Sequence, residues 1–252
     1  MQEIYSTSDV ANIIGIHPNT VRLYEDLKLI TAPERKANGY RVFTKLHIQQ
    51  FQIARIALQV EILQNGLRKH SVEIIKATAN KEFDLALQLT QDYTNKVNLE
   101  IEHAQEAIRI VEEILSGRVK VDSNQEMTRK ETALYLNITM DTLRNWEMNG
   151  LFTVKRKQNG YRVYTDADIK QLKIIRSLRC ANYSLSAILR MLTGVSKNPN
   201  ADIRTMIDTP FIQDDIISAC DMLLTSLHRA KGNAQIIYSR LTEMKKENNP
   251  PL

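Results

Sequence analysis

The sequence has few of the residues on which specialised scaffolds depend. Its 252 residues include two cysteines, eight glycines, six prolines and one tryptophan. Two cysteines in no close motif provide neither a disulfide framework nor a cysteine-based zinc site. No apolar run approaches the length that crosses a bilayer, and no basic segment followed by an apolar core opens the chain as in a signal peptide. We therefore expect a cytoplasmic protein without a membrane partner.

Motifs that carry catalysis are also missing. We find no Gly-rich phosphate loop, no nucleophile elbow and no paired carboxylates. We therefore expect no enzyme activity, no cofactor and no metal site. Scarce glycine and proline, with abundant Leu, Ile, Ala, Glu, Gln and Lys, predict a mainly α fold. The net charge of +5 is a mild excess that is compatible with a polyanionic partner.

The chain contains an internal repeat. Residues 39–44 (GYRVFT) recur as residues 160–165 (GYRVYT), and residues 20–25 (TVRLYE) recur as residues 142–147 (TLRNWE). The two offsets, 121 and 122 residues, are far longer than the period of a solenoid repeat. The sequence therefore predicts two copies of one whole domain.

Each copy has the pattern of two short helices followed by a hairpin. Capping boxes at Ser6 and at Thr128 open the first helix of the two copies. Gly15 makes the turn between the helices of the first copy, and Gly150 stops the second helix of the second copy. An Asn-Gly pair between strand-forming residues then predicts a hairpin in each copy. Two winged helix-turn-helix domains are expected.

Both copies resemble the DNA-binding head of MerR-type regulators. The shared features are a Thr-hydrophobic-Arg stretch that ends in an aromatic residue and Glu, and a Gly-Tyr-Arg wing. The family's first aromatic residue is replaced by Leu23 and by Asn145. The resemblance covers residues 5–75 and 127–192, and it implies a bacterial transcription regulator. Such a regulator would bind double-stranded DNA and distort a promoter so that RNA polymerase can engage.

The resemblance and the geometry of the motif assign the DNA contacts. The start of the second helix lies in the major groove, and wing cations hold the flanking backbone. The alternative is that these basic residues only face solvent. The cations recur at matched positions in the two copies, which disfavours that alternative. For Asn19, a base contact and a helix cap remain alternatives. The candidates in the first copy are His17, Asn19, Thr20, Arg22, Tyr24, Arg35, Lys36, Tyr40 and Arg41. Those in the second copy are Thr139, Asp141, Thr142, Arg144, Asn145, Trp146, Arg156, Lys157, Tyr161 and Arg162.

Two stretches have apolar residues spaced alternately by three and four. They run from Leu87 to Leu115 and from Ile216 to Met244, about four heptads each. This pattern predicts coiled-coil helices, with an ordinary core helix as the alternative. The first helix is acidic, with eight Asp or Glu against three Lys or Arg in residues 81–117. It is therefore expected to pair with a helix and not with DNA.

The predicted order of segments joins these elements. It comprises the first head (1–80), the first coiled-coil helix (81–117), a linker (118–127), the second head (128–193), an irregular connection (194–210) and the second coiled-coil helix (211–247).

In the family that the chain resembles, two chains pair their long helices antiparallel. By this resemblance, the two long helices of one chain would pair with each other, so that one polypeptide imitates a dimer and its heads read two dissimilar half-sites. The alternative is a homodimer that swaps these helices and has four heads. A small-molecule effector would bind between heads and helices, or near residues 194–210. The alternative functions are an architectural DNA-binding accessory and a protein-binding adaptor.

Overall fold

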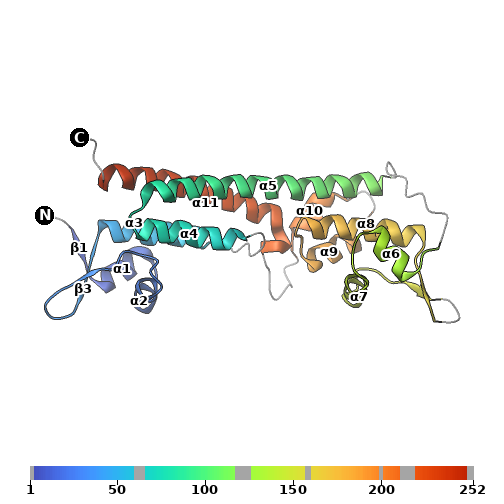
Figure 1. Ribbon diagram of the computed structural model, residues 1–252, viewed down its shortest axis with the longest axis horizontal. Coiled ribbons are helices and arrows are strands. Elements are labelled where there is room, and N and C mark those ends of the chain that lie inside the picture. Colours follow the sequence, from blue (N-terminus) through green and yellow to red (C-terminus); the bar gives the residue numbers. More distant parts are fainter. Residues whose placement is uncertain are drawn as a thin grey trace. The chain divides into compact units, whose positions relative to one another are not determined.

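The computed structural model describes residues 3–59, 66–116, 126–156, 160–198, 201–210 and 219–248. The described chain is mainly helical, with a few short strands (Figure 1). It forms two compact units. The first unit combines residues 1–99 with residues 227–252, and the second contains residues 100–226. Among the described helices, none is long and apolar enough to pass through a membrane.

The first head is a winged helix-turn-helix, as the sequence predicts. Its elements are β1 (Ile4–Tyr5), α1 (Thr7–Ile14), α2 (Pro18–Asp26), β2 (Glu34–Arg35), β3 (Arg41–Thr44), α3 (Lys45–Ala57) and α4 (Leu67–Ala79). Ser6 and Asp9 form the capping box of α1, and the bond from the Ser6 backbone lowers the pKa of the Asp9 carboxyl. Gly15, at φ 70°, provides the left-handed turn into α2. Strand β3 pairs antiparallel with both β1 and β2.

A small apolar core fixes α2 in the first head. Val10, Val21, Phe43 and Phe51 are fully buried, and each contributes about 1.5–3 kcal/mol of burial energy. The ring of Tyr24 stacks on Phe51 with 5.2 Å between centroids. The exposed face of α2 is therefore held in one orientation by residues of α1, β3 and α3.

The second head repeats this architecture. Its elements are α6 (Arg129–Tyr135), α7 (Met140–Met148), β4 (Lys155–Arg156), β5 (Arg162–Val163), α8 (Asp166–Cys180) and α9 (Leu185–Lys197). Thr128 and Glu131 form the expected capping box. Met127 bridges Tyr164, which corresponds to the pairing of Tyr5 with Phe43 in the first head. The internal repeat therefore extends to the strand register.

The connection 194–210, which was expected to be irregular, contains the helix α10 (Ile203–Asp208). Asp202 caps this helix by accepting a hydrogen bond from the Thr205 backbone at 3.0 Å. The buried guanidinium of Arg190 donates to the carbonyl oxygens of Met206, Ile207 and Asp221. A helix of six residues is stable here because a buried cation in α9 holds its end.

The two long helices have the predicted heptad cores. They are α5 (Phe83–Leu115) and α11 (Leu223–Asn248), the latter preceded by the 3₁₀ turn η2 (Ala219–Met222). Val97, Ala104 and Val111 are buried in α5, and Leu227 and Leu241 are buried in α11. Cys220, in η2, is buried. Residues 211–218 of the expected second helix lie outside the described residues.

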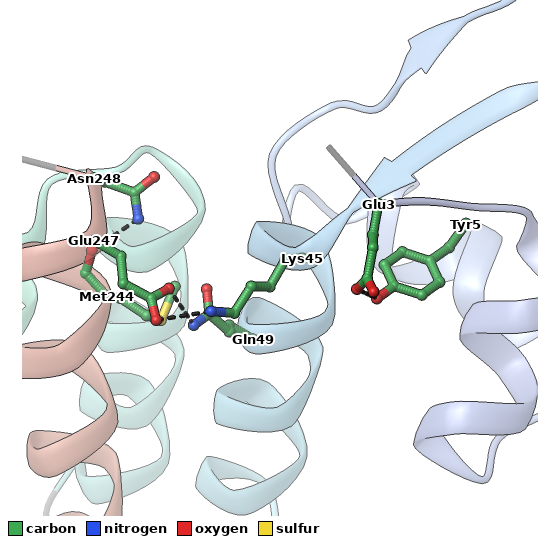
Figure 2. Close-up of polar contacts among 7 residues, drawn as sticks. All are labelled: Glu3, Tyr5, Lys45, Gln49, Met244, Glu247 and Asn248. Atoms are coloured by element: carbon green, nitrogen blue, oxygen red, sulfur yellow. Dashed lines mark hydrogen bonds and ion pairs between the residues drawn. The ribbon is translucent and has the colours of Figure 1, made fainter. Parts of the chain in front are cut away.

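Within the first unit, α11 packs on the first head. Glu247 accepts hydrogen bonds from the Lys45 Nζ at 2.8 Å and the Gln49 Nε2 at 3.0 Å, both in α3 (Figure 2). Further along, Arg240 donates to Gln52, and Asn233 donates to the Ile56 carbonyl at 3.1 Å. The last helix of the second copy is therefore part of the compact unit that contains the first head.

The helix α11 runs antiparallel to the start of α5. Lys245, near the end of α11, pairs with Asp84, at the start of α5. Ala234 and Ile237, which precede Lys245, line a small cavity together with Tyr93, which follows Asp84. The two helices therefore run in opposite directions, and Figure 1 shows them side by side in the first unit.

Candidate nucleic-acid interface

The start of α2 presents polar groups on an exposed surface. His17 is the N-cap, because its Nδ1 accepts a hydrogen bond from the Asn19 backbone at 3.2 Å. The side chain of Asn19 is therefore not the cap. Its Oδ1 instead accepts a hydrogen bond from the Arg22 guanidinium at 2.7 Å. Asn19 and Arg22 are both exposed, and Thr20 is partly covered, so this end of the helix offers hydrogen-bonding groups to a ligand.

The start of α7 presents a different set of groups. Thr139 caps the helix by accepting from the Thr142 backbone at 3.0 Å, and the two hydroxyls lie 2.9 Å apart. Asp141 and Arg144 are exposed. Within the described residues, neither of their side chains makes a hydrogen bond or an ion pair. Asn145, also exposed, accepts from the amide of Asn149.

The two aromatic candidates are buried. Tyr24 and Trp146 occupy matched positions, and each is about one-twentieth exposed. Tyr24 stacks on Phe51, and Trp146 of α7 lines a groove together with Arg176 of α8. Burial favours a positioning role, in which these rings set the angles of α2 and α7 while the polar groups of the two helices face outward.

In each head, a glutamate of α2 or α7 forms ion pairs with arginines of the wing. Glu25 accepts from Arg41 and, at 3.1 Å, from Arg35. Glu147 accepts from the Nε of Arg162 at 2.9 Å, and Arg156 lies 4.0 Å from it. The first carboxylate is only 14% exposed. Sequence reasoning gave these glutamates no role, although both lie in the repeated motif.

This tie separates the wing arginines into two kinds. The side chains of Arg41 and Arg162 are about a quarter exposed or less. They therefore hold the wing against the helix. Arg35 and Arg156 are about half exposed, so they can still reach a phosphate. The wing is positioned by charge-assisted hydrogen bonds before any ligand binds.

The substitution Glu25→Gln is expected to loosen the first wing. Loss of the carboxylate weakens two partly exposed hydrogen bonds to arginine, so the free energy of unfolding should fall by about 1 kcal/mol. Urea unfolding measures that change, and hydrogen exchange of residues 35–41 measures the mobility of the wing. The control is Glu73→Gln in α4, whose carboxylate is exposed and lies 3.9 Å from Lys69. Equal exchange rates in both variants would contradict the tie.

The wing tips carry exposed aromatic and basic side chains. Tyr40 and Tyr161, at matched positions, are 71% and 73% exposed. Lys36 closes the first tip, where its backbone donates to the Tyr40 carbonyl at 2.9 Å. Gly39 takes φ 80°, a conformation that favours glycine. The predicted contact Lys157 lies outside the described residues.

Grooves border both α2 and α7. A groove of about 860 Å³ in the first head is lined by the start of α1, by Arg22 and by the wing. In the second head, a groove of about 520 Å³ lies between α7 and α8 and includes Arg176 and Arg179. Sequence reasoning missed Arg176, although Arg55 occupies the matched position 121 residues earlier. Within the described residues, no three His, Cys, Asp or Glu side chains gather as a metal site.

Two winged helix-turn-helix domains with exposed polar residues at the helix starts and cations on the wings are typical of DNA-binding proteins. Comparison with known proteins agrees. The model of the MerR HTH family regulatory proteins matches residues 127–195, and that of the MerR family regulatory proteins matches residues 6–43. The chain belongs to the MerR family. It is a regulator and not an enzyme.

Individual relatives are transcriptional regulators of bacteria. The HTH-type transcriptional regulator CueR of Escherichia coli O6:H1 is 31% identical over 102 residues, which is 36% of this chain and 76% of CueR. CueR of Salmonella typhi is 32% identical over 94 residues, which is 33% of this chain and 68% of that CueR. The regulator ZntR of Escherichia coli K12 is 34% identical over 64 residues, which is 25% of this chain and 45% of ZntR. No solved structure matches the chain significantly.

Proposed function

We propose that this chain regulates promoters as a single-chain imitation of a family dimer, with two different heads that read two dissimilar half-sites. The observation that carries the proposal is the docking of α11. This helix follows the second head in sequence but bonds to α3 of the first head through Glu247, Arg240 and Asn233. In a homodimer, a partner chain would supply that helix.

The second unit supports the same interpretation. Residues 100–115 of α5, which follows the first head in sequence, belong to the unit that contains the second head. Asn182, in the turn before α9, donates to Glu100 of α5 at 3.3 Å. Each long helix thus begins after one head and ends in the unit of the other. The swapped homodimer remains the alternative arrangement, and the intrachain contacts favour the single chain.

Two unlike heads require an operator with two unlike halves. His17, Asn19 and Arg22 face the first half-site, and Thr139, Asp141 and Arg144 face the second. The operator is then an imperfect inverted repeat that is bound in one orientation. Lys36, Lys157, Arg35 and Arg156 hold the backbone, and Arg41 and Arg162 keep the wings in place. RNA polymerase in the bacterial cytoplasm is the proposed partner, and an effector would bind near residues 194–210 or between heads and helices.

The substitutions Arg22→Ala and Arg144→Ala are each expected to weaken specific DNA binding by about 1–3 kcal/mol, the range for one charge-assisted contact. Fluorescence anisotropy with a labelled operator measures the change. The control is Arg109→Ala, which removes an exposed arginine that pairs with Glu106 on the acidic helix α5, and it should bind like the wild type. Unchanged affinity in both single variants would mean that α2 and α7 are not the recognition helices.

Sequencing the genomic fragments captured by the purified protein identifies the operator, and transcription from such a fragment tests the function. We expect transcript output to change when the protein is added. The alternative, an architectural accessory, predicts bent DNA with unchanged output. A protein that captures no preferred sequence would contradict the proposal.

A further inference from the structure

One matched position differs in chemistry between the recognition helices. Asn19 is the second residue of α2, and Asp141 is the second residue of α7. They are related by the same 122-residue offset as Arg22 and Arg144. Both are exposed, and neither caps its helix, because His17 and Thr139 do so. Both side chains are therefore available at the end of the helix that meets base edges.

The first head offers hydrogen-bond donors at this position. The Oδ1 of Asn19 accepts from Arg22 at 2.7 Å, so the Asn19 amide nitrogen is left to donate. Because the Nδ1 of His17 accepts from the Asn19 backbone, the neutral ring carries its proton on Nε2 and also donates. Two donors in the major groove match the N7 and O6 acceptors of purines better than thymine, which has the single acceptor O4 beside a methyl group.

The second head offers an acceptor at the same position. The Asp141 carboxylate can only accept hydrogen bonds, and within the described residues it has no partner. The hydroxyls of Thr139 and Thr142 bond to each other, and the Thr139 hydroxyl also accepts from the Thr142 backbone. In the major groove, cytosine presents only the amino group N4, which donates to a carboxylate. The carbonyl oxygens of guanine and thymine repel the carboxylate, and adenine places the acceptor N7 beside its donor N6.

We propose that Asp141 selects a cytosine in the half-site of the second head, whereas the matched base of the first half-site is a purine. This inference rests on the proposed function. Arg144, one turn along the same exposed face, would take a neighbouring guanine. The carboxylate also opposes the phosphates, so the second head binds poorly where the cytosine is missing. Position 141 thereby fixes the orientation of the chain on its operator.

Selection from a pool of randomised duplexes tests this proposal with the full chain. The wild type should enrich cytosine at one position of one half-site, with about tenfold discrimination, the range for one base contact. The variant Asp141→Asn should lose that cytosine preference and leave the other half-site unchanged. The matched variant Asn19→Asp should gain a cytosine preference in the first half-site. Circular dichroism checks that both exposed substitutions leave the fold intact.

Two results would overturn the inference in distinguishable ways. If Asp141→Asn raises the affinity for every duplex by the same factor and keeps the wild-type base preferences, Asp141 acts only as a bulk charge. The proposed function then stands and the base assignment is wrong. If the wild type enriches no sequence at all, the proposed function fails together with the inference.

Discussion

Replacing Ile237 with aspartate is expected to destabilise the first unit by at least about 4 kcal/mol, because the change removes a buried aliphatic side chain and buries a carboxylate. Ile237 is 3% exposed. It lines a small cavity with Ala57 and Ile74 of the first head and with Tyr93 of α5. The expected effect exceeds that of any surface substitution and falls on a head that lies about 180 residues earlier in the sequence.

The neighbouring residue provides the control. Ile236 is on the same helix but is 47% exposed, so Ile236→Asp should change stability by no more than about 0.5 kcal/mol. Urea unfolding measures both variants, and hydrogen exchange shows where protection is lost. We expect Ile237→Asp to expose the amides of α3 and α4. Normal protection of these amides in that variant would mean that α11 does not dock on the first head.

Specific DNA binding is expected to depend steeply on salt. If the two heads neutralise about six to ten phosphates, the affinity should fall about 10³- to 10⁵-fold between about 50 and 200 mM salt. The cause is the release of counterions from DNA when cations such as Lys36, Arg35 and Arg156 replace them. The acidic face of α5 does not contribute, because its carboxylates repel the phosphates.

The slope of log affinity against log salt provides the measurement. Replacing Lys36, an exposed wing cation, with alanine should reduce this slope by about one and weaken all sequences alike. Replacing the exposed Lys69 of α4 should leave the slope unchanged. A wild-type slope near zero would contradict an interface held mainly by phosphate contacts.

The local signals in the sequence predicted the heads correctly. The capping boxes at Ser6 and Thr128, the turn at Gly15 and the first Asn-Gly hairpin each depend on residues a few positions apart. The second Asn-Gly pair begins at Asn159, which lies outside the described residues. Such interactions can be recognised without a tertiary structure. The heptad spacing in the sequence also predicted α5 and α11, because one face of each helix is buried along its length.

Interactions between distant residues explain what the sequence did not reveal. Glu25 and Glu147 each join a helix to a wing that lies 10 to 16 residues away. The repeated motif contains both glutamates, but it does not show which distant arginines they bind. The start of α11 is capped by Asp208, which accepts from the Leu224 backbone at 2.9 Å. Arg190 of α9 is buried and holds α10 by donating to the Ile207 carbonyl, 17 residues away. In each case a side chain forms a hydrogen bond or an ion pair with a group that lies well outside its own local segment of the sequence.

The mass of the complex with DNA tests the central claim most directly. Light scattering on a duplex with one operator reports how many chains bind. We expect a single 29.0 kDa chain per duplex, with both half-sites protected in a footprint of the same sample. A bound mass of about 58 kDa, twice the 29.0 kDa of one chain, would contradict the account, because each operator would then need a swapped pair of chains.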